Sequence, residues 1–150
     1  MDTMESLFDR VWNEPLFYST GRLIAAAVFA GLVGYERERR EQEAGLRTHI
    51  LVGIGACLFT LLMTVLVDRF EADQVRADPI RVVEAITAGI AFLAAGAIIQ
   101  ARGQVKGLTT GASLWVAGAV GLAAGLGEYG LGLVAVILTL IVLRLLTFLK

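Results

Sequence analysis

Two short polar segments, each at the start of an apolar segment, carry the residues most able to bind a ligand. They contain Arg47, Thr48 and His49 in one case, and Arg102, Lys106, Thr109 and Thr110 in the other. A helix start has unpaired N–H groups and the positive end of the helix dipole. Two such starts at one membrane surface predict a site for a phosphate, a nucleotide tail or a lipid headgroup. The alternative is that these cations only meet lipid phosphate.

A charged stretch precedes the first of these segments and breaks at Gly45. Oppositely charged residues stand four apart in it, which predicts a helical extension with ion pairs. The pairs are Glu36–Arg40, Arg37–Glu41 and Arg39–Glu43. The stretch is either a solvated helix end or, with Glu36 and Arg37 facing outward, a docking surface for another protein.

His49 is the single histidine. The unperturbed pKa of imidazole is near 6.5, so His49 could sense pH. The alternative is a histidine whose ring nitrogens are simply satisfied by hydrogen bonds. Thr109 or Thr110 could cap the helix that follows Lys106.

Glu84 is a carboxylate inside an apolar segment, and such a group suggests a proton or cation relay, to which Asp78 and neighbouring acids could deliver an ion. The alternative is structural, because Arg81 stands three residues earlier and could form an ion pair with it. Elsewhere, the His, Cys and carboxylate residues lack metal-ligand spacing, and no serine or cysteine has a base beside it. We therefore expect no enzyme, no metal site and no cofactor.

The distribution of charge identifies the elements that position these residues. The chain has 150 residues, of which 57% are apolar and 18% charged, with 17 glycines. The windows 16–35, 48–67, 82–100, 107–127 and 129–149 contain Arg22, Glu84 and Arg144 as their charged residues. About 20 apolar residues cross the hydrocarbon layer as a helix. The pattern therefore predicts an integral membrane protein and excludes a soluble globule, and the net charge of −1 gives no basic field for nucleic acid.

The fold predicted is all-α, one membrane domain over 1–150, built as a compact bundle of five transmembrane helices. The spans are about 16–35, 48–67, 79–101, 107–127 and 129–149. Asp78 should cap the third helix, with Pro79 at its first position, and Arg22 should snorkel outward from the first. Apolar residues at helical spacing in the first 12 residues predict a short amphipathic helix on the membrane surface, the alternative being a frayed terminus.

The positive-inside rule gives the orientation. Eight of the 13 Lys and Arg residues fall on one side, which includes the loops around Arg40 and Gln104 and the C-terminus. We therefore expect the N-terminus outside and the C-terminus in the cytoplasm of a multi-pass inner-membrane protein.

Small residues predict where the helices touch. In lipid, helices associate through close backbone approach at such residues. Two helices carry glycines at heptad spacing: Gly89 and Gly96 in the third, and Gly111, Gly118 and Gly125 in the fourth. The stripes predict helix–helix contact, either within one bundle or between the two copies of a homodimer. We also expect the bundle to contact membrane lipid.

Several of these segments together resemble the N-terminal membrane domain of the MgtC/SapB family. They are Gly34–Arg37, Ala44–His49, Asp78–Val82, Gly89–Gly96 and Gly107–Thr110. The resemblance runs from about residue 20 to 130. Ala91 and Ala94 stand where the family usually has glycine, and the chain ends at Lys150 without the soluble C-terminal domain of longer members.

The resemblance implies a bacterial inner-membrane protein of magnesium limitation, acid stress or survival in host cells. Family members are described as regulators or partners of other membrane machines, including the proton-translocating ATP synthase. Our first hypothesis is thus a non-enzymatic regulator that binds another membrane protein. The second is a small oligomeric channel or carrier for Mg²⁺ or protons, and a third is a lipid-headgroup binder.

Overall fold

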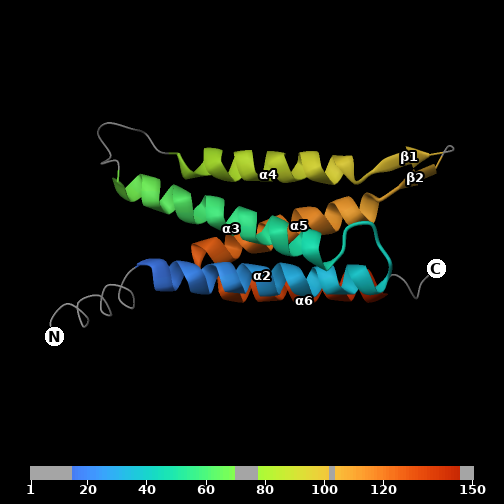
Figure 1. Cartoon of the computed structure of the whole chain (residues 1–150), viewed down its shortest axis with the longest axis horizontal. Helices are drawn as coiled ribbons and strands as arrows, with labels where there is room; N and C mark the ends of the chain where they lie inside the picture. The colour runs from blue at the N-terminus through green and yellow to red at the C-terminus, as the bar shows by residue number, and fades with distance from the viewer. Residues whose placement is uncertain (1–14, 70–77, 102–103, 146–150) are drawn as a thin grey trace.

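The computed structural model describes residues 15–69, 78–101 and 104–145 (Figure 1). Its elements are, in order, α2 (Pro15–Arg39), α3 (Leu46–Arg69), α4 (Pro79–Gly96), β1 (Ile99–Ala101), β2 (Gln104–Lys106), α5 (Leu108–Leu126) and α6 (Tyr129–Leu145). The predicted all-α architecture with five helices in a bundle is confirmed in this part of the chain. Four helices, α2 to α5, are long and apolar enough to cross a membrane, and α6 is a shorter apolar helix. The predicted amphipathic helix falls in residues 1–14, outside the described residues.

Successive helices run in opposite directions, so each end of the bundle contains both helix starts and helix ends (Figure 1). At one end, α2, α4 and α6 finish and α3 and α5 begin. We call it the Arg37 end, after the arginine in the last turn of α2. At the opposite end, which we call the Asp78 end, α4 begins after Asp78.

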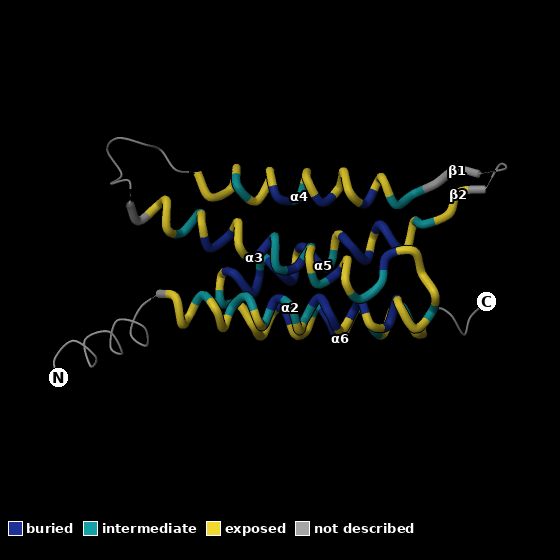
Figure 2. The backbone as a smooth tube through the Cα atoms, viewed as in Figure 1, coloured by how far each residue is buried: buried dark blue, intermediate teal, exposed yellow. Residues whose placement is uncertain are grey.

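The centre of the bundle is formed by α2, α3 and α5, which make the most extensive contacts with one another. Its largest apolar cluster consists of Ala30, Val33, Ala117, Val120 and Val136. α6 packs against α5 and α2, whereas α4 packs mainly on α5. Figure 2 shows the consequence: buried residues run along α5, while α4 is exposed over most of its length.

Backbone contacts at glycines hold the central helices together. A Cβ added at Gly121 would fall on the carbonyl oxygen of Gly53, so α5 and α3 touch backbone to backbone. A Cβ at Gly125 would lie 3.0 Å from the Cys57 carbonyl oxygen. On the α4 side, one at Gly111 would lie 3.0 Å from the Ala94 carbonyl oxygen, and one at Gly118 would overlap Ile90. The fourth-span stripe therefore lies at helix contacts.

The predicted stripe of the third span, Gly89 and Gly96, does not lie at helix contacts. No heavy atom of the described chain lies within 4 Å of a Cβ built at Gly89 or Gly96. The prediction of close packing at these two positions is wrong for the single chain. The reason is the rotation of α4, which turns Ile86, Ile90 and Ala94 toward the bundle instead.

The segment between α4 and α5 also differs from the prediction. The third span was expected to reach residue 101, but α4 ends at Gly96 and an antiparallel hairpin follows, with Ile99 opposite Lys106. Gly107 is the N-cap of α5 and has a φ of 84°. Because glycine has no side chain, this helix has no side-chain cap. The expected capping by a threonine is therefore wrong, because α5 already begins at Leu108 and both threonines lie inside its first turn.

Two charged groups at the Asp78 end, Asp78 and Arg22, make structural contacts. Asp78 caps α4 as expected, with its Oδ1 accepting a hydrogen bond from the Ile80 N–H at 3.0 Å. Arg22 does not simply snorkel outward: its Nη1 donates to the carbonyl oxygen of Gly125 at 2.8 Å. It thereby satisfies one of the free carbonyls at the end of α5 and ties that end to α2.

The backbone contact at Gly121 yields a stability prediction. In Gly121→Ala, the new methyl group must push α5 away from α3, and such overpacking destabilises by about 1–3 kcal/mol. We expect a lower melting temperature of the purified protein in detergent. Gly21→Ala is the matched control, because nothing lies within 4 Å of a Cβ at Gly21 on α2. Equal melting temperatures for both variants would contradict the packing.

Candidate functional site

Polar side chains are buried at the Arg37 end, where the membrane-spanning helices α2, α3 and α5 converge. The cluster comprises Glu36, Arg37, His49, Thr110 and Ser113. Burial of charged and polar groups is costly unless they are paired or hydrogen-bonded. The contacts within this cluster therefore decide what it can do.

Glu36 is the centre of the charged part. Its Oε2 accepts from the Nε of Arg37 at 3.0 Å, and its Oε1 accepts from the Nε of Arg40. Arg37 is only 4% exposed, and its Nη1 has no hydrogen-bond partner among the described residues. One buried carboxylate is thus shared by two guanidinium groups.

Of the three predicted ion pairs, the structure contains Glu36–Arg40. The pairs Arg37–Glu41 and Arg39–Glu43 are absent from the described residues. The cause is that α2 ends at Arg39 and Glu41 turns the chain with a φ of 53°. The predicted helical extension is therefore shorter than expected.

The start of α3 is held against the end of α2. Glu38 Oε2 accepts a hydrogen bond from the Leu46 N–H at 2.7 Å, which places a carboxylate at the positive end of α3. Gly34 makes the close approach possible, since a Cβ there would lie 2.7 Å from the Cβ of His49. These contacts position His49 on the inner face of α3.

His49 is completely buried, and both of its ring nitrogens have partners. Nδ1 lies 2.8 Å from the Gly45 carbonyl oxygen, and Nε2 lies 3.0 Å from the Ser113 hydroxyl oxygen. Because a carbonyl can only accept, Nδ1 carries a proton, and a neutral His49 accepts at Nε2. The Ser113 hydroxyl also lies 2.9 Å from the Thr110 carbonyl, and its one proton serves one acceptor at a time. The geometry matches the hydrogen-bonded alternative for His49.

The structure separates the predicted ligand-binding residues into two groups. Glu36, Arg37, His49 and Thr110 are buried in the cluster. Arg47, Thr48, Lys106 and Thr109 are exposed at the surface of the Arg37 end, and Arg102 lies outside the described residues. Sequence reasoning missed Ser113 and Glu38. A serine three positions after Thr110 in an apolar helix was the available signal for Ser113.

At the Asp78 end, the expected pair between Arg81 and Glu84 is not formed. Arg81 lies instead 3.7 Å from the Asp78 carboxylate, and Glu84 is exposed with no ion pair in the described chain. Asp78, Arg81 and Glu84 line a shallow hollow of about 640 Å³ with Ile80, Ala85 and Ala88.

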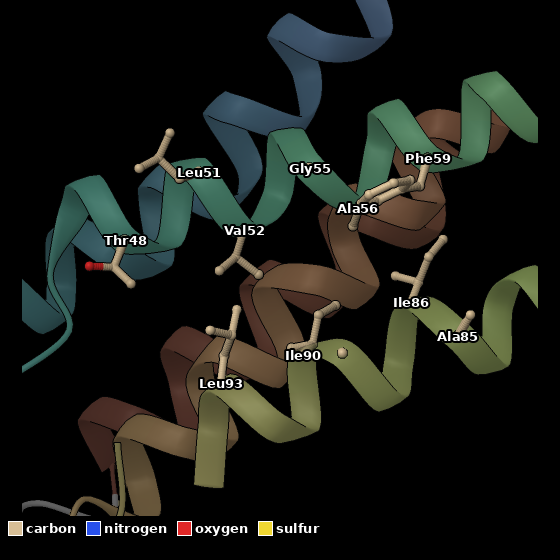
Figure 3. Close-up of a pocket in the computed structure, with 11 residues that line it drawn as sticks. Thr48, Leu51, Val52, Gly55, Ala56, Phe59, Ala85, Ile86, Ile90 and Leu93 are labelled. Carbon is tan, nitrogen blue, oxygen red and sulfur yellow. The ribbon is translucent and has the colours of Figure 1, made fainter. Parts of the chain in front are cut away.

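An apolar groove of about 590 Å³ runs between α3 and α4. Figure 3 shows its side chains: Val52 projects from α3 toward α4, and Ile86, Ile90 and Leu93 project from α4 toward α3. It is lined by Thr48, Leu51, Val52, Gly55, Ala56 and Phe59 from α3, and by Ala85, Ile86, Gly89, Ile90 and Leu93 from α4. The groove is open to the surroundings of the bundle because α4 packs on α5 and only lightly on α3.

Comparison with known proteins gives a consistent match. A family model described as the MgtC family matches residues 23–150. The chain is 40% identical over 124 residues to a protein of Escherichia coli K12 named putative magnesium transporter YhiD, covering 82% of this chain and 58% of that protein. It is 39% identical over 117 residues to a protein of Brucella abortus named MgtC, covering 78% and 46% respectively. The chain thus spans about half the length of these relatives. No solved structure matches it.

The buried hydrogen bond to His49 yields a prediction. Ser113→Ala removes the partner of Nε2, and an unsatisfied buried group in a helix bundle costs about 0.5–2 kcal/mol. We expect a lower melting temperature in detergent. Ser19→Ala makes the same chemical change at a half-buried site on α2 and should leave the melting temperature unchanged. If Ser113→Ala melts like the unmodified protein, the hydrogen bond contributes nothing to stability.

Proposed function

This chain belongs to the MgtC family, and from that premise we propose that it acts as a non-enzymatic regulator by binding another membrane protein. The groove between α3 and α4 receives one transmembrane helix of the partner. The observation that carries this proposal is the groove itself, an apolar recess on the outside of a multi-pass membrane bundle.

The lining of the groove favours a helix over lipid as its occupant. Gly55 and Ala56 on α3 and Ala85 and Gly89 on α4 all line the groove, and all four are small residues. Acyl chains adapt to side chains of any size, whereas helix backbones approach closely only across small residues. Gly55 and Gly89 both have free space around a built Cβ within the described chain, so they do not serve its own packing.

The packing of the bundle centre also supports a binding role over a pathway through a single bundle. The space between α3 and α5 is closed by the backbone contact of Gly53 and Gly121. Around it, the cluster that includes Ala30, Val33 and Ala117 is apolar. Transport pathways are typically lined by polar or ionisable groups.

Exposed polar groups at the Arg37 end would complete the docking surface. Thr48 lies at one end of the groove, and Arg47 is exposed beside it. Glu36 and Arg37, which were expected to face outward, are buried and paired with each other instead. On the proposed orientation, this end faces the cytoplasm of a bacterial cell.

The names of the relatives suggest the physiological context. The relative in Escherichia coli is named a putative magnesium transporter, so growth in low magnesium is the first condition to test. The family resemblance adds acid stress and growth in host cells as further conditions. It also makes the proton-translocating ATP synthase a first candidate partner.

Filling the groove tests the partner proposal. Gly89→Leu places a large side chain in the groove, and we expect it to abolish co-purification of the partner from native membranes. Gly130→Leu is the matched control, because Gly130 lies on the exposed face of α6 with nothing within 4 Å of a Cβ. A partner that co-purifies equally with both variants would contradict the groove as its docking site. Recovery of a second copy of the chain alone would indicate a homodimer instead.

A second candidate function is a channel or carrier for Mg²⁺ or protons, formed by several copies. The hollow that Asp78 and Glu84 line at the Asp78 end favours it, because exposed carboxylates there could collect cations. It also agrees with the name of the Escherichia coli relative, a putative magnesium transporter.

Reconstitution in liposomes separates this candidate from the regulator. If the chain conducts, Glu84→Gln should reduce Mg²⁺ or proton flux at least about tenfold, as loss of a required intramembrane charge does. Glu128→Gln, at an exposed carboxylate before α6, should leave the flux unchanged. Under the regulator proposal, neither the unmodified protein nor its variants carry a flux above that of empty liposomes.

A further inference from the structure

We propose that a second pocket, at the Arg37 end, binds a phosphate group. The pocket is lined by Glu36, Arg39 and Arg40 from the end of α2 and by Arg144 from the end of α6, and its volume is about 430 Å³. α2 and α6 lie side by side, with these ends together (Figure 1). We call it the arginine pocket. It is separate from the groove between α3 and α4, and the inference does not depend on the partner proposal.

The charge of the arginine pocket is unbalanced. Its lining contains three arginines and one carboxylate, that of Glu36. Both oxygens of this carboxylate already accept hydrogen bonds, one from Arg40 and one from the buried Arg37. Arg39 and Arg144 have no ion pair in the described part of the chain. An anion in the pocket would therefore supply negative charge that the described part of the chain does not provide there.

A buried group beside the pocket points the same way. The Nη1 of Arg37 has no hydrogen-bond partner in the described chain, although Arg37 is almost entirely buried. A buried guanidinium that shares its only carboxylate with a second arginine is under-neutralised. An anion bound next to Glu36 would stabilise both Arg37 and Arg40.

The arginines are held in positions suited to a tetrahedral anion. Arg40 is anchored to Glu36 through its Nε, which leaves its terminal amino groups for a ligand. The guanidinium carbon of Arg39 lies 5.9 Å from the centre of the Tyr35 ring, a cation–π contact that limits its movement. Guanidinium groups donate two parallel hydrogen bonds to phosphate oxygens, which makes arginine the preferred phosphate ligand.

The surroundings of Arg144 favour a lipid as the source of the phosphate. Arg144 also lines a shallow apolar depression on α6, of about 430 Å³, with Ile137, Leu140, Ile141 and Leu145. A phospholipid whose headgroup sits in the arginine pocket could lay an acyl chain in this depression. Basic pockets between helices at the cytoplasmic surface bind anionic headgroups in this manner. Inorganic phosphate from the cytoplasm shares the same chemistry and is the other source.

Native mass spectrometry of the purified full chain tests the site. The probe is phosphatidylglycerol, compared with phosphatidylcholine of the same acyl chains. We expect the protein to retain phosphatidylglycerol preferentially and Arg144→Gln to weaken this at least about tenfold, the change that about 1.4 kcal/mol produces. Arg81→Gln is the matched control, since it removes the same charge from an exposed position at the opposite end of the bundle, outside the pocket.

A competition arm distinguishes the two sources. Inorganic phosphate is added and compared with chloride at equal ionic strength. Displacement of phosphatidylglycerol by phosphate but not by chloride identifies free phosphate as a ligand of the pocket, whereas retention identifies the lipid. The proposal is overturned if the two lipids bind alike, or if Arg81→Gln and Arg144→Gln reduce binding equally.

Discussion

In a lipid bilayer, burial of apolar side chains does little to bring helices together, because acyl chains are as apolar as leucine. The bundle therefore depends on the direct contact of backbones, as at Gly53 and Gly121, where α3 and α5 leave no room for a Cβ. Gly34 does the same for the start of α3 on α2. These contacts fix the helices at a spacing at which His49 and Ser113 can reach each other, so the polar cluster is a consequence of the glycine contacts.

The same constraint explains which surfaces remain open. α4 packs through Ile86 and Ile90 on α5 and leaves Gly89 without a neighbour. A small residue that is not used within the chain is an available contact for another helix, and Gly55 lies opposite it across the groove. At the Arg37 end, the buried carboxylate of Glu36 binds Arg37 and Arg40. The positive charges of Arg39 and Arg144 remain at the arginine pocket. The packing of the helices thus leaves two separate surfaces open, the groove and the arginine pocket.

Much of the fold could be predicted from the sequence, because the segregation of charge locates the helices and Asp78 with Pro79 marks the start of α4. The positions of side chains were harder to predict. Gly89 and Gly111 look alike in the sequence, since heptad spacing identifies a small face but not the helix opposite it. Ser113 contacts His49 across 64 residues, for which a local pattern gives no signal. The hairpin between α4 and α5 was missed because β1 directly continues the apolar segment of α4, so the sequence gives no sign that the helix ends at Gly96.

Photo-cross-linking in intact cells tests the central claim that the groove between α3 and α4 holds a partner helix. A photoreactive phenylalanine analogue is placed singly at Leu93, which lines the groove, and at the neighbouring Phe92, which is 80% exposed and lies outside it. The account predicts a cross-linked protein from position 93 and products with lipid from position 92. Identical products from the two positions, or lipid products from both, would contradict it.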